Sequence, residues 1–171
     1  MNKILGYIKK RKARFFILAI LCVAYYFCLP KQLFKTPTST VITSSNNTLI
    51  GAKIASDGQW RFPHNDSIPI KFKTCIIQFE DEYFYKHPGF NPVSIFKALQ
   101  QNLKSGTVKR GGSTITQQVI RLSRQGKPRT YFEKLKELIL ATRLELRTSK
   151  EKILSYYASN APFGGNVVGL D

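Results

Sequence analysis

Acidic residues and cysteines are both scarce in this sequence. The 10 Asp and Glu stand against 27 Lys and Arg, which leaves a formal charge of +17. Such a charge favours a polyanionic partner, either nucleic acid, an anionic bilayer surface or a pyrophosphate-bearing ligand, and charge alone does not choose among them. Two of the three cysteines, Cys22 and Cys28, fall in an apolar run and Cys75 stands alone, so neither a disulfide framework nor a zinc-binding spacing is present. With 43% hydrophobic residues, the chain is nevertheless expected to fold around a core.

The N-terminus combines a basic flank with an apolar run. Residues 1–14 hold six basic side chains and no acid, and they lead into fifteen uncharged residues, 15–29. This order predicts insertion into a membrane with the N-terminus inside. The run is short for a span, which typically needs about 20 residues, and a cleaved signal peptide has an apolar stretch of similar length. Because bulky residues replace the small-x-small cleavage pattern, we favour an uncleaved anchor, with a cytoplasmic tail at 1–14 and a transmembrane helix at 15–30.

The next segments predict a linker and a hairpin. From 31 to 47 the composition shifts to Thr, Ser, Pro and Asn without an amphipathic period, which is typical of a polar linker. Beyond it, two short apolar-rich runs flank Asp57-Gly58, a dipeptide favoured in tight turns. We therefore expect a two-stranded β-hairpin near residues 48–62.

Helix signals dominate beyond Pro69. Capping residues followed by helix-forming sequence predict helix starts at Asn91, Thr114, Thr130 and Ser149. Gly106 is expected to end the first of these helices, and the third is expected to run to about Arg147 at the centre of the core. One face of this long helix carries Leu135, Leu138, Ile139 and Thr142, and a different face carries Lys134, Glu137 and Ala141.

Two short stretches hold the residues best suited to chemistry. The stretch 80–89, EDEYFYKHPG, supplies three of the ten acids and one of the two histidines, although a solvated helix end explains this spacing equally well. The stretch 110–118, RGGSTITQQ, places two glycines before a capped helix start, where backbone N–H groups bind phosphate-like anions; an ordinary glycine loop is the alternative. The cations that follow favour the anion site. They are Arg121, Arg124, Lys127, Arg129, Lys134 and Lys136.

The order of these stretches resembles a known family. EDEYFYKHPGF, then GGSTITQQ about thirty residues on, then the helix with Lys134-x-x-Glu137 and then KEKILSYYASNAPFGGN are similar to successive motifs of glycosyltransferase family 51. DGQWRFP and NAPFGGN most resemble the penicillin-binding proteins of the 1C type. The resemblance covers about 48–171, so this range is expected to form a mainly α-helical, lysozyme-like glycosyltransferase domain with a small β-hairpin.

The resemblance implies a peptidoglycan glycosyltransferase that polymerises lipid II into glycan strands for cell wall biogenesis and releases undecaprenyl pyrophosphate. In that reaction a sugar 4-hydroxyl attacks an anomeric carbon bearing a lipid pyrophosphate, so a base must act on the nucleophile and cations on the leaving group. The leaving pyrophosphate takes no proton, so the acid of a glycosidase is not strictly needed. Carried over motif by motif, Glu80 is the general base, and Glu137 is the second catalytic carboxylate, which organises the diphosphate region.

The same resemblance implies the other site residues and the partners. Substrate phosphates or sugars are expected to be bound by Ser113, Thr114, Gln117, Gln118, Arg121, Arg129 and Lys134. The first motif is expected to be supported by Asp81, Phe84 and His87. No metal-ligand set is assigned, and a divalent cation, Mg or Mn, is the one cofactor left open. The expected partners are lipid II, the nascent glycan strand, the membrane and other cell wall synthesis proteins. Nucleic acid is not expected, because the anchor would hold the chain in the inner membrane with its domain in the periplasm.

Several positions depart from the family pattern. Glu133 stands where a basic residue usually precedes Lys134, and Asn91 stands where Asp is common. Ser155 and Ser159 stand where the fourth motif usually has Glu and Asn. Each departure is expected to lower activity. The fifth motif and any transpeptidase domain would follow the last residue of this sequence, so the domain is expected to be C-terminally incomplete and to bind lipid II without polymerising it.

Two other functions stay open at this point. A lytic transglycosylase or lysozyme-like hydrolase would use Glu80 as an acid, but its neutral glycan requires no pyrophosphate clamp. A truncated, non-catalytic, membrane-tethered module that binds lipid II or glycan is the main alternative, and the motif departures favour it. Release of free lipid pyrophosphate from lipid II would separate a polymerase from both.

Overall fold

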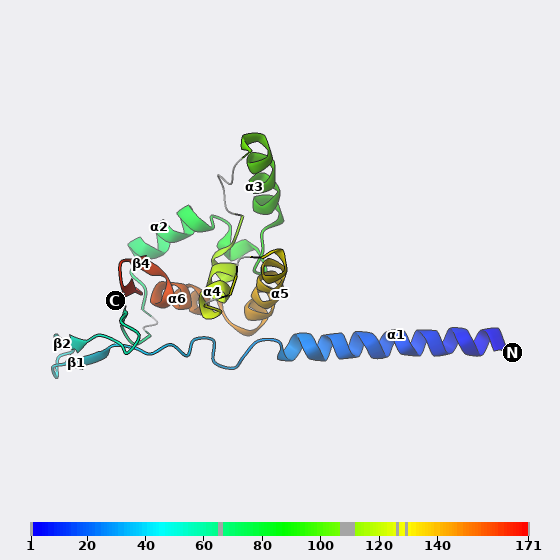
Figure 1. Ribbon diagram of the computed structural model, residues 1–171, viewed down its shortest axis with the longest axis horizontal. Coiled ribbons are helices and arrows are strands. Elements are labelled where there is room, and N and C mark those ends of the chain that lie inside the picture. The colour runs from blue at the N-terminus through cyan, green and yellow to red at the C-terminus, as the bar shows by residue number, and fades with distance from the viewer. Residues whose placement is uncertain (1, 65–66, 107–111, 126, 129, 171) are drawn as a thin grey trace. The chain divides into compact units, whose positions relative to one another are not determined.

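The computed structural model describes residues 2–64, 67–106, 112–125, 127–128 and 130–170. The chain divides into two compact units, Met1–Gln32 and Leu33–Asp171. The first unit contains one helix, α1 (Asn2–Phe27), coloured blue in Figure 1. Most of the large apolar side chains of α1 from Phe15 onward are exposed. Within the described residues, no helix combines the length and the apolarity needed to cross a membrane.

The second unit begins with a hairpin that differs from the predicted one. Strand β1 (Thr40–Thr43) pairs antiparallel with β2 (Leu49–Lys53), so one strand of the hairpin lies in the segment expected to be a linker. The sequence of β1, TVIT, is β-branched throughout, which favours a strand. In the turn between them, Asn47 adopts a left-handed conformation with φ 63°, which Asn tolerates better than most residues do.

The segment beyond β2 joins a different sheet. Strand β3 (Trp60–Arg61) pairs parallel with β5 (Val167–Val168), and β5 pairs antiparallel with β4 (Pro162–Gly164). A tight turn does form at Asp57-Gly58, closed by a 3.0 Å backbone hydrogen bond from the Gly58 N–H. The hairpin predicted at 48–62 is therefore right in its turn and wrong in its strand pairing, because a C-terminal strand supplies the partner of β3.

Helices are the main regular elements of the second unit (Figure 1). They are α2 (Ile70–Glu80), the short 3-10 helix η1 (Phe84–Lys86), α3 (Pro92–Ser105), α4 (Ile115–Ser123), α5 (Tyr131–Arg147) and α6 (Lys150–Asn160). The four predicted helix starts are confirmed, since each capping side chain accepts a hydrogen bond from the backbone N–H three residues on. Gly106 ends α3 in the left-handed conformation with φ 65°, as predicted. The mainly helical fold class is therefore confirmed.

Helix α4 is the centre of the helical core. It packs against both α5 and α6, and its residues Ile115 and Ile120 are fully buried. The expectation that the helix at 130–147 is central holds for its C-terminal half only, where Leu140 and Leu144 are buried. Burying these side chains against one another is the main source of the domain's stability.

The face of α5 that turns inward is not the apolar face read from the sequence. Leu135 and Ile139, on the apolar face read from the sequence, are 55% and 41% exposed. Ala141, on the other face, is fully buried, and two turns earlier along the helix Lys134 reaches the side chain of Gln117 on α4. As a result, α5 directs Lys134 and Glu137 toward α4.

Candidate active site

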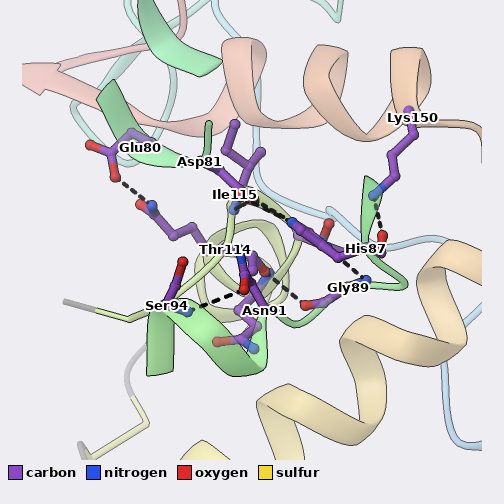
Figure 2. A network of polar contacts seen from close by, with 12 residues as sticks. Glu80, Asp81, His87, Gly89, Asn91, Ser94, Thr114, Ile115 and Lys150 are labelled. Carbon is purple, nitrogen blue, oxygen red and sulfur yellow. Dashed lines mark hydrogen bonds and ion pairs between the residues drawn. The ribbon is translucent and has the colours of Figure 1, made fainter. Parts of the chain in front are cut away.

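The first pocket lies where α2 ends against the start of α4. Glu80, the last residue of α2 and labelled in Figure 2, accepts through Oε2 a 2.6 Å hydrogen bond from the Nε2 amide of Gln118 on α4. The pocket has a volume of about 410 Å³. Its lining also includes Asp81, Ser94, Lys97, Ser113, Thr114 and Arg121. A carboxylate held in this way at an open pocket can accept a proton from a bound hydroxyl.

Asp81 joins the turn after Glu80 to the start of α4. Its carboxylate contacts His87 Nε2 at 2.9 and 3.0 Å, and its Oδ2 also accepts a 3.0 Å hydrogen bond from the backbone N–H of Ile115. The N–H of Gly89 donates to the other ring nitrogen of His87, Nδ1, at 3.1 Å. The ring proton is therefore assigned to Nε2, the nitrogen that faces the Asp81 carboxylate (Figure 2). This network fixes the backbone that presents the Glu80 carboxylate.

Gly89 brings the same turn against α5. Its φ is 93°, and a Cβ at this position would lie 2.9 Å from the backbone of Ala141. Its carbonyl accepts a 2.7 Å hydrogen bond from Thr114 Oγ1, and the carbonyl of His87 accepts another at 2.7 Å from Lys150 Nζ. The residues predicted to support the first motif are all buried, namely Asp81, Phe84 and His87.

The second pocket is organised around Lys134. Its Nζ donates to Ser113 Oγ at 2.7 Å, to Gln117 Oε1 at 2.9 Å and to Glu137 Oε2 at 3.2 Å. Gln117 is fully buried, and its Nε2 has no hydrogen-bond partner among the residues that the structure describes. The pocket has a volume of about 260 Å³. Its charged lining consists of Arg121, Arg124, Lys127, Lys134, Glu133 and Glu137.

The two pockets adjoin one another because Ser113 and Arg121 line both. Glu80 lines the first pocket and Glu137 the second, so the two expected catalytic carboxylates face neighbouring hollows. The expected substrate-binding residues that line at least one pocket are Ser113, Thr114, Gln118, Arg121 and Lys134. Gln117 lies inside the fold, where it holds Lys134.

Three residues at or near this site were not predicted from the sequence, and one predicted residue lies outside the part of the chain that the structure describes. Lys97 and Tyr83 line the first pocket, and neither was assigned a role, although Tyr83 lies within the first motif. Tyr157 of α6 is buried near Glu80; burial, followed by the negative charge of Glu80, raises the pKa of Tyr157 to about 12. Its phenol therefore stays neutral beside the carboxylate. Arg129 lies outside the described residues.

Ser155 and Ser159, two of the departures from the family pattern, bind the same side chain. His64 Nδ1 lies 3.0 Å from Ser159 Oγ, and its Nε2 lies 3.0 Å from Ser155 Oγ and 3.1 Å from Lys152 Nζ. An ammonium group can only donate, so Nε2 is the acceptor and the ring proton is assigned to Nδ1. The two serines thereby tie the segment before α2 to α6.

In the part of the chain that the structure describes, no three His, Cys, Asp or Glu residues lie close enough together to hold a metal ion.

The fold and the two pockets define a class of protein. A mainly helical domain that sets a carboxylate beside a cation-rich pocket can deprotonate a hydroxyl and stabilise an anionic leaving group, as enzymes that transfer sugars from glycosyl phosphates require. The family model described as transglycosylase matches residues 47–171. The chain belongs to this transglycosylase family, which confirms the resemblance to glycosyltransferase family 51.

Named relatives agree with this family. Penicillin-binding protein 1C of Escherichia coli (strain K12) is 37% identical over 142 residues, which cover 82% of this chain and 18% of the relative. Penicillin-binding protein 1A/1B of Bacillus subtilis (strain 168) is 37% identical over 144 residues, which cover 83% and 15%. A monofunctional glycosyltransferase of Staphylococcus aureus (strain JH9) is 39% identical over 110 residues, which cover 64% and 40%. The chain thus spans less than half the length of each of these relatives.

Proposed function

We propose that this chain is a peptidoglycan glycosyltransferase, which polymerises lipid II into glycan strands and releases undecaprenyl pyrophosphate. The observation that carries the proposal is the Glu80 carboxylate, held by Gln118 at a pocket that adjoins the cationic one. The family match supports it, as do relatives named penicillin-binding protein and monofunctional glycosyltransferase.

In the proposed reaction Glu80 takes the proton of the acceptor 4-hydroxyl. The hydroxyl oxygen then bonds to the anomeric carbon of the donor sugar, and the bond from that carbon to the pyrophosphate oxygen breaks with both electrons leaving on the oxygen. Arg121 and Lys134 stabilise the charge that develops on the diphosphate. Glu137 holds Lys134 in place through their 3.2 Å ion pair.

We also infer that the chain is bound to the inner membrane through α1 as a single span, with its N-terminus in the cytoplasm and its domain in the periplasm. The exposed apolar side chains of α1 and the basic residues before them support this placement. It would keep the domain beside its lipid-linked substrate and the growing glycan strand.

Glu80→Gln tests the catalytic assignment, because it keeps the shape of the side chain and removes its basicity. With the full chain in detergent and lipid II as substrate, we expect release of undecaprenyl pyrophosphate to fall by about 10² to 10⁴, the usual cost of removing a positioned base. Lipid II binding should persist, since the cationic pocket is unchanged. Glu151→Gln serves as the control, because it also removes one negative charge, from an exposed residue of α6, and it should keep the unmodified rate.

Two outcomes would contradict the proposal. Equal release by Glu80→Gln and the unmodified chain would mean that the base lies elsewhere. Binding of lipid II by the unmodified chain without any release of pyrophosphate would instead identify a non-catalytic, membrane-tethered binding module.

A further inference from the structure

Glu133 lies between two cations at the second pocket. It occupies the first turn of α5, and its carboxylate pairs with Nη2 of Arg124 on one side and with Nζ of Lys136, at 3.1 Å, on the other. The side chain is only 16% exposed, and Glu133 and Arg124 both line the pocket. Arg124, one of the donors that line this pocket, is thus engaged by a carboxylate of the chain itself.

This arrangement alters the charge that the pocket presents to a ligand. Arg121, Arg124, Lys127 and Lys134 line the pocket as cations, and Glu133 and Glu137 line it as acids. Glu137 is paired with Lys134, and Glu133 is paired with Arg124. The hydrogen bond from Lys136, with further help from Arg124, lowers the pKa of Glu133, so its carboxylate is ionised at neutral pH.

A guanidinium group binds carboxylate and phosphate oxygens with the same donors and in the same planar geometry. A carboxylate that already holds Arg124 therefore competes with any phosphate that enters the pocket. We propose that Glu133 is a built-in counter-anion of the second pocket, a specificity-determining residue that weakens the binding of diphosphate ligands by occupying Arg124. This inference rests on the proposed function, because it takes the diphosphate of the substrate as the ligand of this pocket.

Glu133→Gln distinguishes the counter-anion role from a role in starting helix α5. Gln serves as well as Glu at the third position of a helix that begins with Thr, so the start of α5 is preserved while the charge is removed. In titration calorimetry of the full chain with inorganic pyrophosphate at low ionic strength, we expect binding to tighten about three- to tenfold, the scale of one charge acting across a partly exposed contact. The gain should shrink as salt is added, and Glu133→Ala should show a similar gain.

Two controls make the interpretation specific. Glu151→Gln adds the same net charge on α6, away from the pocket, and should leave the affinity for pyrophosphate nearly unchanged. In an Arg124→Gln background, the gain from Glu133→Gln should largely disappear, since the released donor is no longer there. A gain that survives in this background would overturn the proposal.

The failures can be told apart from one another. If the unmodified chain binds pyrophosphate and Glu133→Gln binds it equally or more weakly, Glu133 is a structural brace and the counter-anion role is wrong, while the proposed function stands. If neither protein binds pyrophosphate, the second pocket is not the diphosphate site and both the inference and that part of the proposed function fail.

Discussion

Lys134 on α5 donates a 2.9 Å hydrogen bond to Oε1 of Gln117, a side chain fully buried within α4. The Lys134 side chain is nevertheless 45% exposed, so it lines the second pocket while its ammonium group contacts a buried side chain. A buried amide thus determines where one of the pocket's cations is held.

Lys134→Ala should therefore weaken the binding of inorganic pyrophosphate. We expect a loss of at least about tenfold, because a hydrogen bond to a charged group contributes about 1.5–3 kcal/mol. Titration calorimetry at fixed ionic strength measures it. Lys71→Ala removes an exposed lysine of α2 that lines neither pocket and is the matched control for charge. An equal loss in both variants would show that only the overall charge of the chain matters.

The helix starts could be read from the sequence because their causes are local. Each capping side chain, such as Asn91 or Ser149, bonds to a backbone N–H only three residues away. The left-handed end of α3 at Gly106 is equally local. Such features depend little on how the rest of the chain packs.

The strand pairing could not be read in the same way. The partner of β3 is β5, more than a hundred residues further along the chain, and no local pattern specifies so distant a partner. The inward face of α5 was missed for a related reason. Burial is decided by what the neighbouring helix offers, so Leu135 stays exposed while Lys134 finds a partner in Gln117.

The candidate site could be predicted from the sequence only in part. The carboxylates Glu80 and Glu137 followed from resemblance to family motifs, and the structure sets them at adjoining pockets. The contacts between motifs did not follow, because they join side chains far apart in sequence. Examples are the hydrogen bond from Gln118 to Glu80 and the hydrogen bonds between His64 and the hydroxyls of Ser155 and Ser159.

Gly89→Ala should destabilise the domain by more than backbone conformation alone would predict. The new Cβ would lie 2.9 Å from the backbone of Ala141, where no flexible side chain can move aside, and φ is 93°. Gly106→Ala provides the comparison, since φ there is 65° but no atom lies within 4 Å of the added Cβ. We expect about 1–2 kcal/mol for Gly106→Ala and at least about 1 kcal/mol more for Gly89→Ala. Urea unfolding followed by circular dichroism measures both losses. Equal losses would show that the backbone shifts enough to remove the close contact between the new Cβ and Ala141.

Asp81→Asn should lower both stability and activity. The change leaves the shape but removes the charge that His87 and the Ile115 N–H bind inside the fold. We expect a loss of about 2–4 kcal/mol in the free energy of unfolding, as for other buried charged contacts. Glu82→Gln, the next acid along the chain and exposed, should cost less than about 0.5 kcal/mol. If the two variants unfold at the same urea concentration, the Asp81 network does not support the fold.

The ion pair of Asp57 and Arg61 should make part of the stability depend on pH. Arg61 Nη1 lies 3.0 Å from Asp57 Oδ2 and also donates a 2.6 Å hydrogen bond to the carbonyl of Pro37. The hydrogen bond from Arg61 lowers the pKa of the Asp57 carboxyl below its ordinary value of 3.8. The folded state therefore favours the ionised carboxylate. Its contribution is present above pH 3.8 and is lost as the pH falls through the lower pKa of the folded state.

Asp57→Asn should accordingly be less stable than the unmodified chain near neutral pH, and the difference should shrink as the pH falls below 3.8. Urea unfolding at pH 7 and at about pH 3 measures the two differences, and the comparison between variants cancels the titration of every other carboxylate. Glu151→Gln is the control, because it removes an exposed carboxylate of α6 and leaves the pair of Asp57 and Arg61 unchanged. Its stability relative to the unmodified chain should not show this dependence on pH. A difference between Asp57→Asn and the unmodified chain that is the same at both pH values would mean that the ion pair does not contribute to folding. Arg61 would then hold the segment at Pro37 through its backbone contacts alone.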